Sequence, residues 1–231
     1  SLLKLANSEE RNIVTVEDPV EYDLPGISQT QINAEIGMTF AAGLRATLRQ
    51  DPDIILVGEI RDAETASTAA QAALTGHLVF SSLHANGSTA AITRLRDLGL
   101  DDYLISSTLR GVIAQRLLRR LCSDCRVPQV PDTQERALFT DLGMDVPDRV
   151  YTPGPGCASC DHTGFNGRVG IFETATVTDE MRHASSEGQS EQALLDLALT
   201  PQETLLGRAL RAVEQGQTTI AETLRVVGDR L

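Results

Sequence analysis

Three short apolar runs, each leading into polar or charged residues, constrain the fold of this 231-residue chain more than any other feature. They are NIVTVE at 12–17, DIILVG at 53–58 and HLVFSSL at 77–83. Between them, segments 39–50 and 61–74 have the periodicity of helices. Strands that are apolar on both faces and alternate with helices are typical of a parallel sheet covered on both sides. The sequence therefore predicts an α/β fold with a mainly parallel sheet.

Composition divides the chain further. Residues 1–9 look helical, and 86–98 and 102–121 fit helices. After Leu121, Pro, Gly, Asp and Cys dominate until about Gly167, and short helices are expected from there to the end. The predicted parts are an α/β core at 1–121, a tetracysteine subdomain at 122–173 and a helical region at 174–231.

Charge and targeting signals narrow the function classes. The net charge of −12 argues against nucleic acid or an anionic membrane as a general partner. Residues 65–93 carry no formal charge, but Gln71, His77 and His84 interrupt the window, which favours a buried helix and strand over a membrane span. The first residues lack the apolar region of a signal peptide, and the pattern of the four cysteines described below suggests metal binding in a reducing cytoplasm.

Phosphate binding by a P-loop is excluded within these residues. A Walker A motif requires Gly-Lys-Ser/Thr. Lys4 is the only lysine, and Leu3 and Leu5 flank it. No Walker A motif is therefore present.

Two Cys-x-x-Cys pairs are the strongest chemical signal. Cys122 and Cys125 form the first pair, and Cys157 and Cys160 form the second. Four thiolates can surround a zinc ion at about 2.3 Å and leave no open position, so the predicted ion is structural. Two disulfides or a redox pair are the alternatives, and the 31 residues between the pairs exceed the usual zinc spacing of about 15–20.

Carboxylates follow two of the predicted strands. Glu17, Asp18 and Glu21 follow the first, and Glu59 follows DIILV in the manner of a Walker B strand. Ligands bind outside the carboxyl ends of strands in such sheets, where one acid can activate water and others can hold the water shell of a metal. A charged loop and a plain core strand are the alternative interpretations.

Histidines and arginines complete the candidate set. His77 and His84 bracket the third strand, so His84 is expected near a γ-phosphate and His77 against a neighbouring element. Arg45, Arg49 and Arg61 can pair with the acids, or one of them can bind phosphate.

In order along the chain, these segments resemble the secretion ATPase superfamily of type II secretion and type IV pilus machines. EDPVEY is similar to its Asp box, DPDIILVGEIRD to its Walker B region and TGHLVFSSLHAN to its His box. AQRLLRRLCSDC and CDHTGFNGRVGIFE resemble the borders of the zinc subdomain in the export branch, and the cysteines disfavour the retraction ATPases, which lack them. CDHTGFNGR is closer to the type II assembly ATPases than to the pilus-extension ATPases.

The resemblance implies roles for individual residues. Glu17 is expected to activate the attacking water, with Asp18 and Glu21 beside it. Glu59 is expected to position Mg²⁺. One of His77 and His84 is expected to contact the γ-phosphate of ATP. Arg61 is carried as a nucleotide-binding candidate, and the four cysteines as zinc ligands.

The resemblance also implies a RecA-like hexamer at the cytoplasmic face of the inner membrane. There, ATP hydrolysis drives pseudopilus assembly through an inner-membrane platform. In that family the Walker A loop lies just upstream of the segment that matches SLLKLANSEERN. We therefore expect the chain alone to be an inactive part of an ATPase, with unpaired edges in its sheet. A pilus-extension motor, a non-enzymatic zinc-stapled interaction module and a thiol oxidoreductase are the alternatives.

Overall fold

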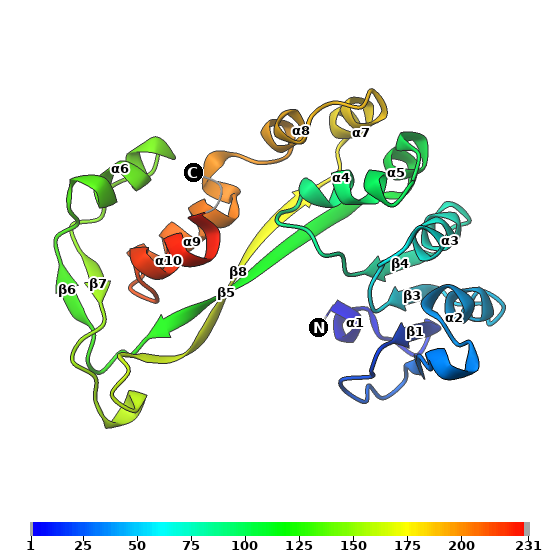
Figure 1. Ribbon diagram of the computed structural model, residues 1–231, viewed down its shortest axis with the longest axis horizontal. Coiled ribbons are helices and arrows are strands. Elements are labelled where there is room, and N and C mark those ends of the chain that lie inside the picture. The colour runs from blue at the N-terminus through cyan, green and yellow to red at the C-terminus, as the bar shows by residue number, and fades with distance from the viewer. Residues whose placement is uncertain (1, 229–231) are drawn as a thin grey trace. The chain divides into compact units, whose positions relative to one another are not determined.

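The computed structural model describes residues 2–228, which form two compact units (Figure 1). The first, here called the sheet unit, comprises the chain up to Ala85 together with Ala90–Arg110 and Thr178–Leu194. The second, here called the ribbon unit, comprises Asn86–Thr89, Gly111–Val177 and the chain from Leu195 onward.

A four-stranded parallel sheet organises the sheet unit. Its strand order is β2-β1-β3-β4, and each neighbouring pair is parallel. The strands are β1 (Ile13–Glu17), β2 (Ser28–Gln31), β3 (Ile54–Val57) and β4 (Leu78–Ser81). The three strands expected from the apolar runs are confirmed, whereas the polar strand β2 was missed because its sequence, SQTQ, has no apolar signal.

Capped helices flank these strands. Thr39 begins α2 by accepting a hydrogen bond from the Ala42 amide (3.2 Å), and Asp62 begins α3 by accepting one from the Thr65 amide (2.8 Å). The helices that begin in this unit are α1 (Leu2–Ala6), η1 (Ala34–Ile36), α2 (Phe40–Thr47), α3 (Ala63–Leu74), α4 (Ala90–Asp97), α5 (Asp102–Thr108), α7 (Asp179–Ser186) and α8 (Glu191–Ala198). Across residues 2–228, none of the helices has the length and apolar character needed to cross a bilayer.

Two long antiparallel strands, β5 and β8, organise the ribbon unit, with α9 and α10 packed along them (Figure 1). Their buried face contributes Ala114, Leu118 and Ile171 to a core that Leu205 and Ala209 of α9 complete. The elements of this unit are β5 (Gly111–Leu121), β6 (Val127–Gln129), α6 (Thr133–Asp141), β7 (Val150–Thr152), η2 (Ala158–Cys160), β8 (Phe165–Thr176), η3 (Pro201–Glu203), α9 (Leu205–Glu214) and α10 (Ile220–Val227).

The helix expected over 102–121 is wrong beyond Thr108. Residues 111–121 form strand β5, in which Ala114 and Leu118 are buried while Ile113 and Leu117 are about half exposed. GVIAQRLLRRL fits both periodicities. Its partner strand begins at Phe165, so pairing distant in the chain decides its conformation.

The compact units also divide the chain differently from the expected boundaries after Leu121 and at 173/174. Pairing of β5 with β8 places the cysteine segment and the last two helices in one unit. Part of the expected helical region, Thr178–Leu194, instead joins the sheet unit, where α7 packs against α5.

In the ribbon unit, the buried carboxylate of Glu222 links α10 to β5. The side chain of Glu222 in α10 is fully buried and accepts hydrogen bonds from Arg225 and from both the backbone amide and the guanidinium of Arg119. Arg119 also lies over the ring of Phe165, with 4.3 Å between its Cζ and the ring centroid. The hydrogen bond from Arg225, followed in importance by that from Arg119, lowers the pKa of Glu222 to about 2.

We expect Glu222→Gln to lower the free energy of unfolding by about 2 kcal/mol at pH 7, less than the full pKa shift implies because Arg119 and Arg225 are 51% and 59% exposed. A depressed carboxyl pKa stabilises the fold above the unfolded-state pKa. This contribution is therefore complete above about pH 5, and less than about half of it remains at pH 3. Denaturant titrations of both proteins between pH 3 and 7 measure it. Glu214→Gln, on the exposed face of α9, is the matched control, and a pH-independent difference contradicts the prediction.

Candidate functional site

The carboxyl ends of β1, β3 and β4 lie side by side at one edge of the sheet. The amide of Gly58 donates to the carbonyl of Val16 (2.7 Å), and the hydroxyl of Ser82 donates to the carbonyl of Gly58 (2.7 Å). A Cβ atom at Gly58 would stand 3.3 Å from the Cα of Glu17, so a glycine allows this close approach. The residues that follow β1 and β3 are thereby brought together, as the parallel-sheet prediction requires.

Glu59 is the central acid of this edge, and 15% of its side chain is exposed. Its Oε1 accepts a hydrogen bond from the Arg61 guanidinium, and its Oε2 lies 3.3 Å from His84 Nε2. The hydrogen bond from Arg61 lowers the pKa of Glu59, and the charges of Arg61 and His84 act in the same direction. The carboxylate is therefore held ionised, as a residue that attracts a cation must be.

One oxygen of Glu59 lacks a conventional partner. Among the described residues, Oε2 is buried and makes no hydrogen bond of good geometry. His84 Nε2 lies 3.3 Å from this oxygen without meeting that geometry. A buried carboxylate oxygen that lacks a well-formed hydrogen bond is costly unless water or a cation approaches it. The donor chemistry and the orphaned oxygen fit a hydrated divalent cation such as Mg²⁺, which prefers carboxylate and water ligands.

Glu17, the last residue of β1, is half-buried and held in place by two neighbours. Its Oε1 accepts hydrogen bonds from the Thr15 hydroxyl (2.5 Å) and from the Gln29 amide (2.9 Å) of β2. Sequence reasoning missed both positioning residues. Thr15, a polar residue inside an apolar strand, was the only local signal, and Gln29 lies in the strand that the sequence did not reveal.

The remaining acids of this edge are exposed. Asp18 and Glu21 both lie in the loop after β1, and the charge of Asp18 contributes, after Glu59, to the raised pKa of Arg61. The loops after β1 and β3 therefore interact electrostatically. Arg45 instead pairs with Glu64 on the helices, at 2.6 Å.

The two histidines lie at opposite ends of β4. His84 follows the carboxyl end, next to Glu59. His77 precedes Leu78 at the amino end, where its Nδ1 lies 2.9 Å from the Ala72 carbonyl and 3.2 Å from the Thr75 hydroxyl. Within this chain, His77 contacts the end of α3 and is not brought to the acidic edge.

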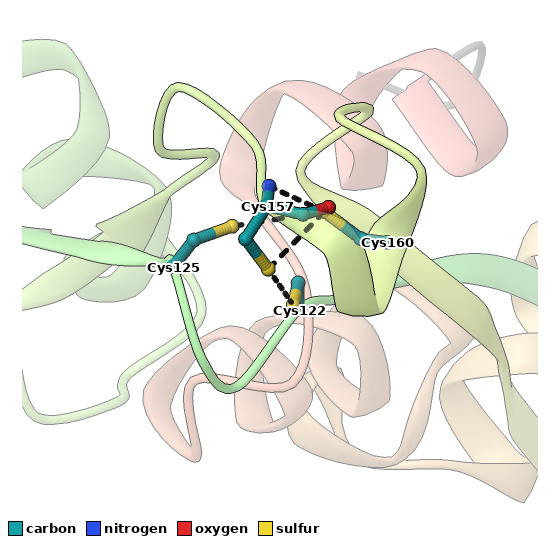
Figure 2. Close-up of side chains that lie close together, drawn as sticks. All are labelled: Cys122, Cys125, Cys157 and Cys160. Carbon is teal, nitrogen blue, oxygen red and sulfur yellow. Dashed lines mark hydrogen bonds between the residues drawn. The ribbon is translucent and has the colours of Figure 1, made fainter.

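The four cysteines converge in the ribbon unit, as Figure 2 shows. Cys122 follows β5 and Cys125 precedes β6, whereas Cys157 precedes the short helix η2 and Cys160 is its last residue. All four are free thiols whose sulfur atoms lie within 4.8 Å of one another. The Cys122–Cys157, Cys125–Cys160 and Cys157–Cys160 sulfur pairs are 3.7, 3.8 and 3.8 Å apart.

These separations fit a tetrahedral metal. Four sulfur atoms at about 2.3 Å from a zinc ion form a tetrahedron with edges of about 3.8 Å. Backbone amides of Cys157 and Gly164 donate to the sulfur of Cys160, each at 3.3 Å. The hydrogen bond from Cys157 lowers the pKa of Cys160 to about 6, whereas burial raises that of Cys125 to about 12. A cation at the centre would offset the repulsion that keeps all four thiols from ionising together.

Glycines permit the tight approach of the two cysteine loops. A Cβ atom at Gly154 would lie 1.8 Å from the carbonyl oxygen of Cys125. Gly156 has φ = +87°, a backbone conformation that other residues rarely adopt. These two glycines therefore make the tight turn before Cys157 possible.

A separate cavity of about 330 Å³ lies in the ribbon unit. Arg119, Tyr151, Glu222 and Arg225 are among its lining residues, and none of the residues predicted for nucleotide or metal lines it. Because the carboxylates of Glu135 and Glu222 balance the charges of Arg119 and Arg225, the cavity has little net charge to offer an anion.

Comparison with known proteins gives the context for both sites. The family model described as "Type II/IV secretion system protein" matches residues 1–225. The type II secretion system protein E of Aeromonas hydrophila is 49% identical over 221 residues, which cover 95% of this chain and 44% of the relative. The type II secretion system ATPase E of Vibrio cholerae is 49% identical over 224 residues, which cover 97% of this chain and 44% of the relative.

A solved structure agrees with the fold. The pilus retraction motor PilT, determined with bound ADP, matches with a TM-score of 0.70 and 27% identity, over 97% of this chain and 55% of that one. Of the two secretion system proteins from Aeromonas hydrophila and Vibrio cholerae, the chain spans less than half the length. Since the family model matches nearly every residue and the resemblance found in the sequence agrees with it, the chain belongs to the type II/IV secretion system protein family.

Proposed function

We propose that this chain supplies the acidic half of an ATP-hydrolysis site in a type II secretion ATPase. The observation that carries the proposal is Glu59, an ionised carboxylate at the carboxyl edge of a parallel sheet, with one buried oxygen lacking a hydrogen-bond partner among the described residues. Ligands of such sheets bind at this edge. The relative named as an ATPase in Vibrio cholerae supports the same assignment.

Each residue of the acidic edge has a proposed role. Glu17 accepts the proton of the attacking water, for which Thr15 and Gln29 orient its carboxylate. Glu59 orients the water shell of Mg²⁺, and Asp18 and Glu21 add negative charge that attracts the ion. When bound, Mg²⁺ supplies charge stabilisation for phosphoryl transfer.

The other proposed roles concern phosphate. His84, beside Glu59, is the histidine placed to contact the γ-phosphate. Arg61 orients Glu59 through its hydrogen bond and is a second candidate for phosphate. His77 keeps a proposed nucleotide role only through family resemblance, and since it lies at the opposite end of β4, a neighbouring subunit would have to present it.

The four cysteines are proposed to hold one structural Zn²⁺. The sulfur separations and the two amide-to-sulfur hydrogen bonds support this assignment. Four sulfur ligands leave no open coordination position, so the ion would stabilise the fold and take no part in hydrolysis.

The parent protein is proposed to be a homo-hexamer at the cytoplasmic face of the inner membrane, where it drives pseudopilus assembly through an inner-membrane platform. A pilus-extension motor is the second candidate, which the resemblance in the sequence leaves open. A zinc-stapled interaction module is the candidate for the chain taken alone, since it contains no Gly-Lys-Ser/Thr to cradle phosphate.

The test is titration calorimetry with Mg²⁺-ATP on residues 1–231 and on the full product of the gene. We expect binding and hydrolysis by the full product and neither by residues 1–231, because backbone amides and a lysine normally supply the main phosphate cradle. Turnover by the short chain would contradict its proposed inactivity. Absence of binding by both proteins would favour the interaction module.

A further inference from the structure

The loop that links β4 to α4 passes from the sheet unit to the ribbon unit and back again. His84 and Ala85 belong to the sheet unit, whereas the next residues, Asn86–Thr89, belong to the ribbon unit. The chain then returns to the sheet unit at Ala90, where α4 begins. We call Asn86–Thr89 the strap.

A buried carboxylate holds the centre of the strap. Glu173 of β8 is fully buried and accepts hydrogen bonds from the backbone amide of Ser88 (2.8 Å) and from its hydroxyl (2.6 Å). Its second oxygen accepts from the amide of Leu205, the first residue of α9 (2.9 Å). All three partners are donors, so both oxygens of Glu173 act as acceptors.

Further contacts fix the rest of the strap. The guanidinium of Arg116 donates to the carbonyl of Asn86 at 3.2 Å. Ser88 and Thr89 are fully buried. A loop held by a buried, charge-assisted network is rigid relative to the unit that holds it.

We infer that Glu173 is a positioning residue for the nucleotide site, acting through the strap on His84. Only Ala85 separates His84 from the strap, so the hydrogen bonds from Ser88 to Glu173 restrict the conformations of the short peptide that carries the imidazole. The inference rests on the proposed function, in which His84 contacts the γ-phosphate. It adds a covalent route by which the ribbon unit influences hydrolysis.

Glu173→Gln tests this because it keeps the size of the side chain and replaces one acceptor oxygen with a donor that faces an N–H group. In the full gene product we expect kcat for ATP to fall about tenfold, with KM changed less than about twofold. Ser88→Ala removes only the hydroxyl contact and is expected to give a smaller loss of kcat. If Glu173→Gln fails to fold, Ser88→Ala carries the test.

Two measurements separate positioning from a general loss of stability. Glu222→Gln is the matched control, because Glu222 is also a fully buried glutamate of the ribbon unit and contacts no residue of the strap in the described chain. We expect it to leave kcat within about twofold of the wild type. In the His84→Ala background, Glu173→Gln should cost little further activity, since residues that act through one another are not additive.

Equal losses in the two glutamate variants, or additive losses in the double variant, would overturn the inference. If the wild-type protein hydrolyses no ATP, the proposed function fails on its own. Hydrogen exchange of residues 84–89 then decides the strap inference. Faster exchange in Glu173→Gln than in Glu222→Gln supports it, and equal exchange overturns it.

Discussion

Glu59→Gln should abolish ATP hydrolysis by the full gene product, with kcat lowered by at least about a hundredfold. The substitution preserves the shape of the side chain but removes its negative charge. Arg61 and His84 both help to keep Glu59 ionised in the folded protein. An amide at this position attracts Mg²⁺ weakly and no longer offers the buried second oxygen as an anionic acceptor.

Steady-state hydrolysis at saturating Mg²⁺-ATP measures the effect, and thermal unfolding of the same samples shows whether the variant is folded. Glu64→Gln is the matched control, because Glu64 is an exposed glutamate of the same unit that pairs with Arg45. We expect that control to retain at least about half of the wild-type rate. Turnover of Glu59→Gln within about threefold of the wild type would remove Glu59 from the proposed site.

Cys157→Ser should remove the bound metal and unfold residues 122–170 while the parallel sheet remains folded. Structural zinc sites contribute about 10–16 kcal/mol of apparent binding energy at pH 7, which is folding energy when the site forms only in the folded chain. Cys157 contributes to two of the three close sulfur pairs, and its amide donates to Cys160. Loss of the Cys157 sulfur therefore disrupts both Cys-x-x-Cys pairs.

Metal analysis should find about one zinc per wild-type chain and almost none in the variant. Limited proteolysis should then cut the variant between 122 and 170 and leave the sheet unit intact. Ser123→Ala is the control, because Ser123 is exposed between the first two cysteines and contributes no sulfur. Unchanged proteolysis of Cys157→Ser, or wild-type protein without metal, would refute the structural zinc proposal.

Local patterns were sufficient for three of the four strands of the parallel sheet. The runs at β1, β3 and β4 are apolar on both faces, and helices with recognisable periodicity and capping residues separate them. Because ligands bind at the carboxyl ends of such strands, the positions of Glu17, Glu59 and His84 at one edge also followed from the sequence. The cysteine cluster was equally predictable, since its spacing restricts the geometry of each pair.

The pairing of strands that are far apart in the chain could not be predicted from the sequence. Strand β5 resembles a helix until its partner β8 is known, and β2 has no apolar residue to reveal it. The expected boundary after Leu121 came from a shift in composition, whereas the compact units follow the pairing of β5 with β8. Such elements are decided by contacts between residues far apart in the chain, for which a single sequence carries no signal.

The sequence by itself therefore determined which residues are chemically capable of nucleotide and metal binding, because that capability depends on residue type and local spacing. Only the tertiary structure decided how they are held. Nothing in the sequence distinguishes Glu173 and Glu222 from exposed acids, yet both are fully buried and fully paired. Burial of a carboxylate depends on hydrogen-bond donors that distant segments supply. Only the folded chain therefore distinguishes a solvated acid from one that links segments far apart in the sequence.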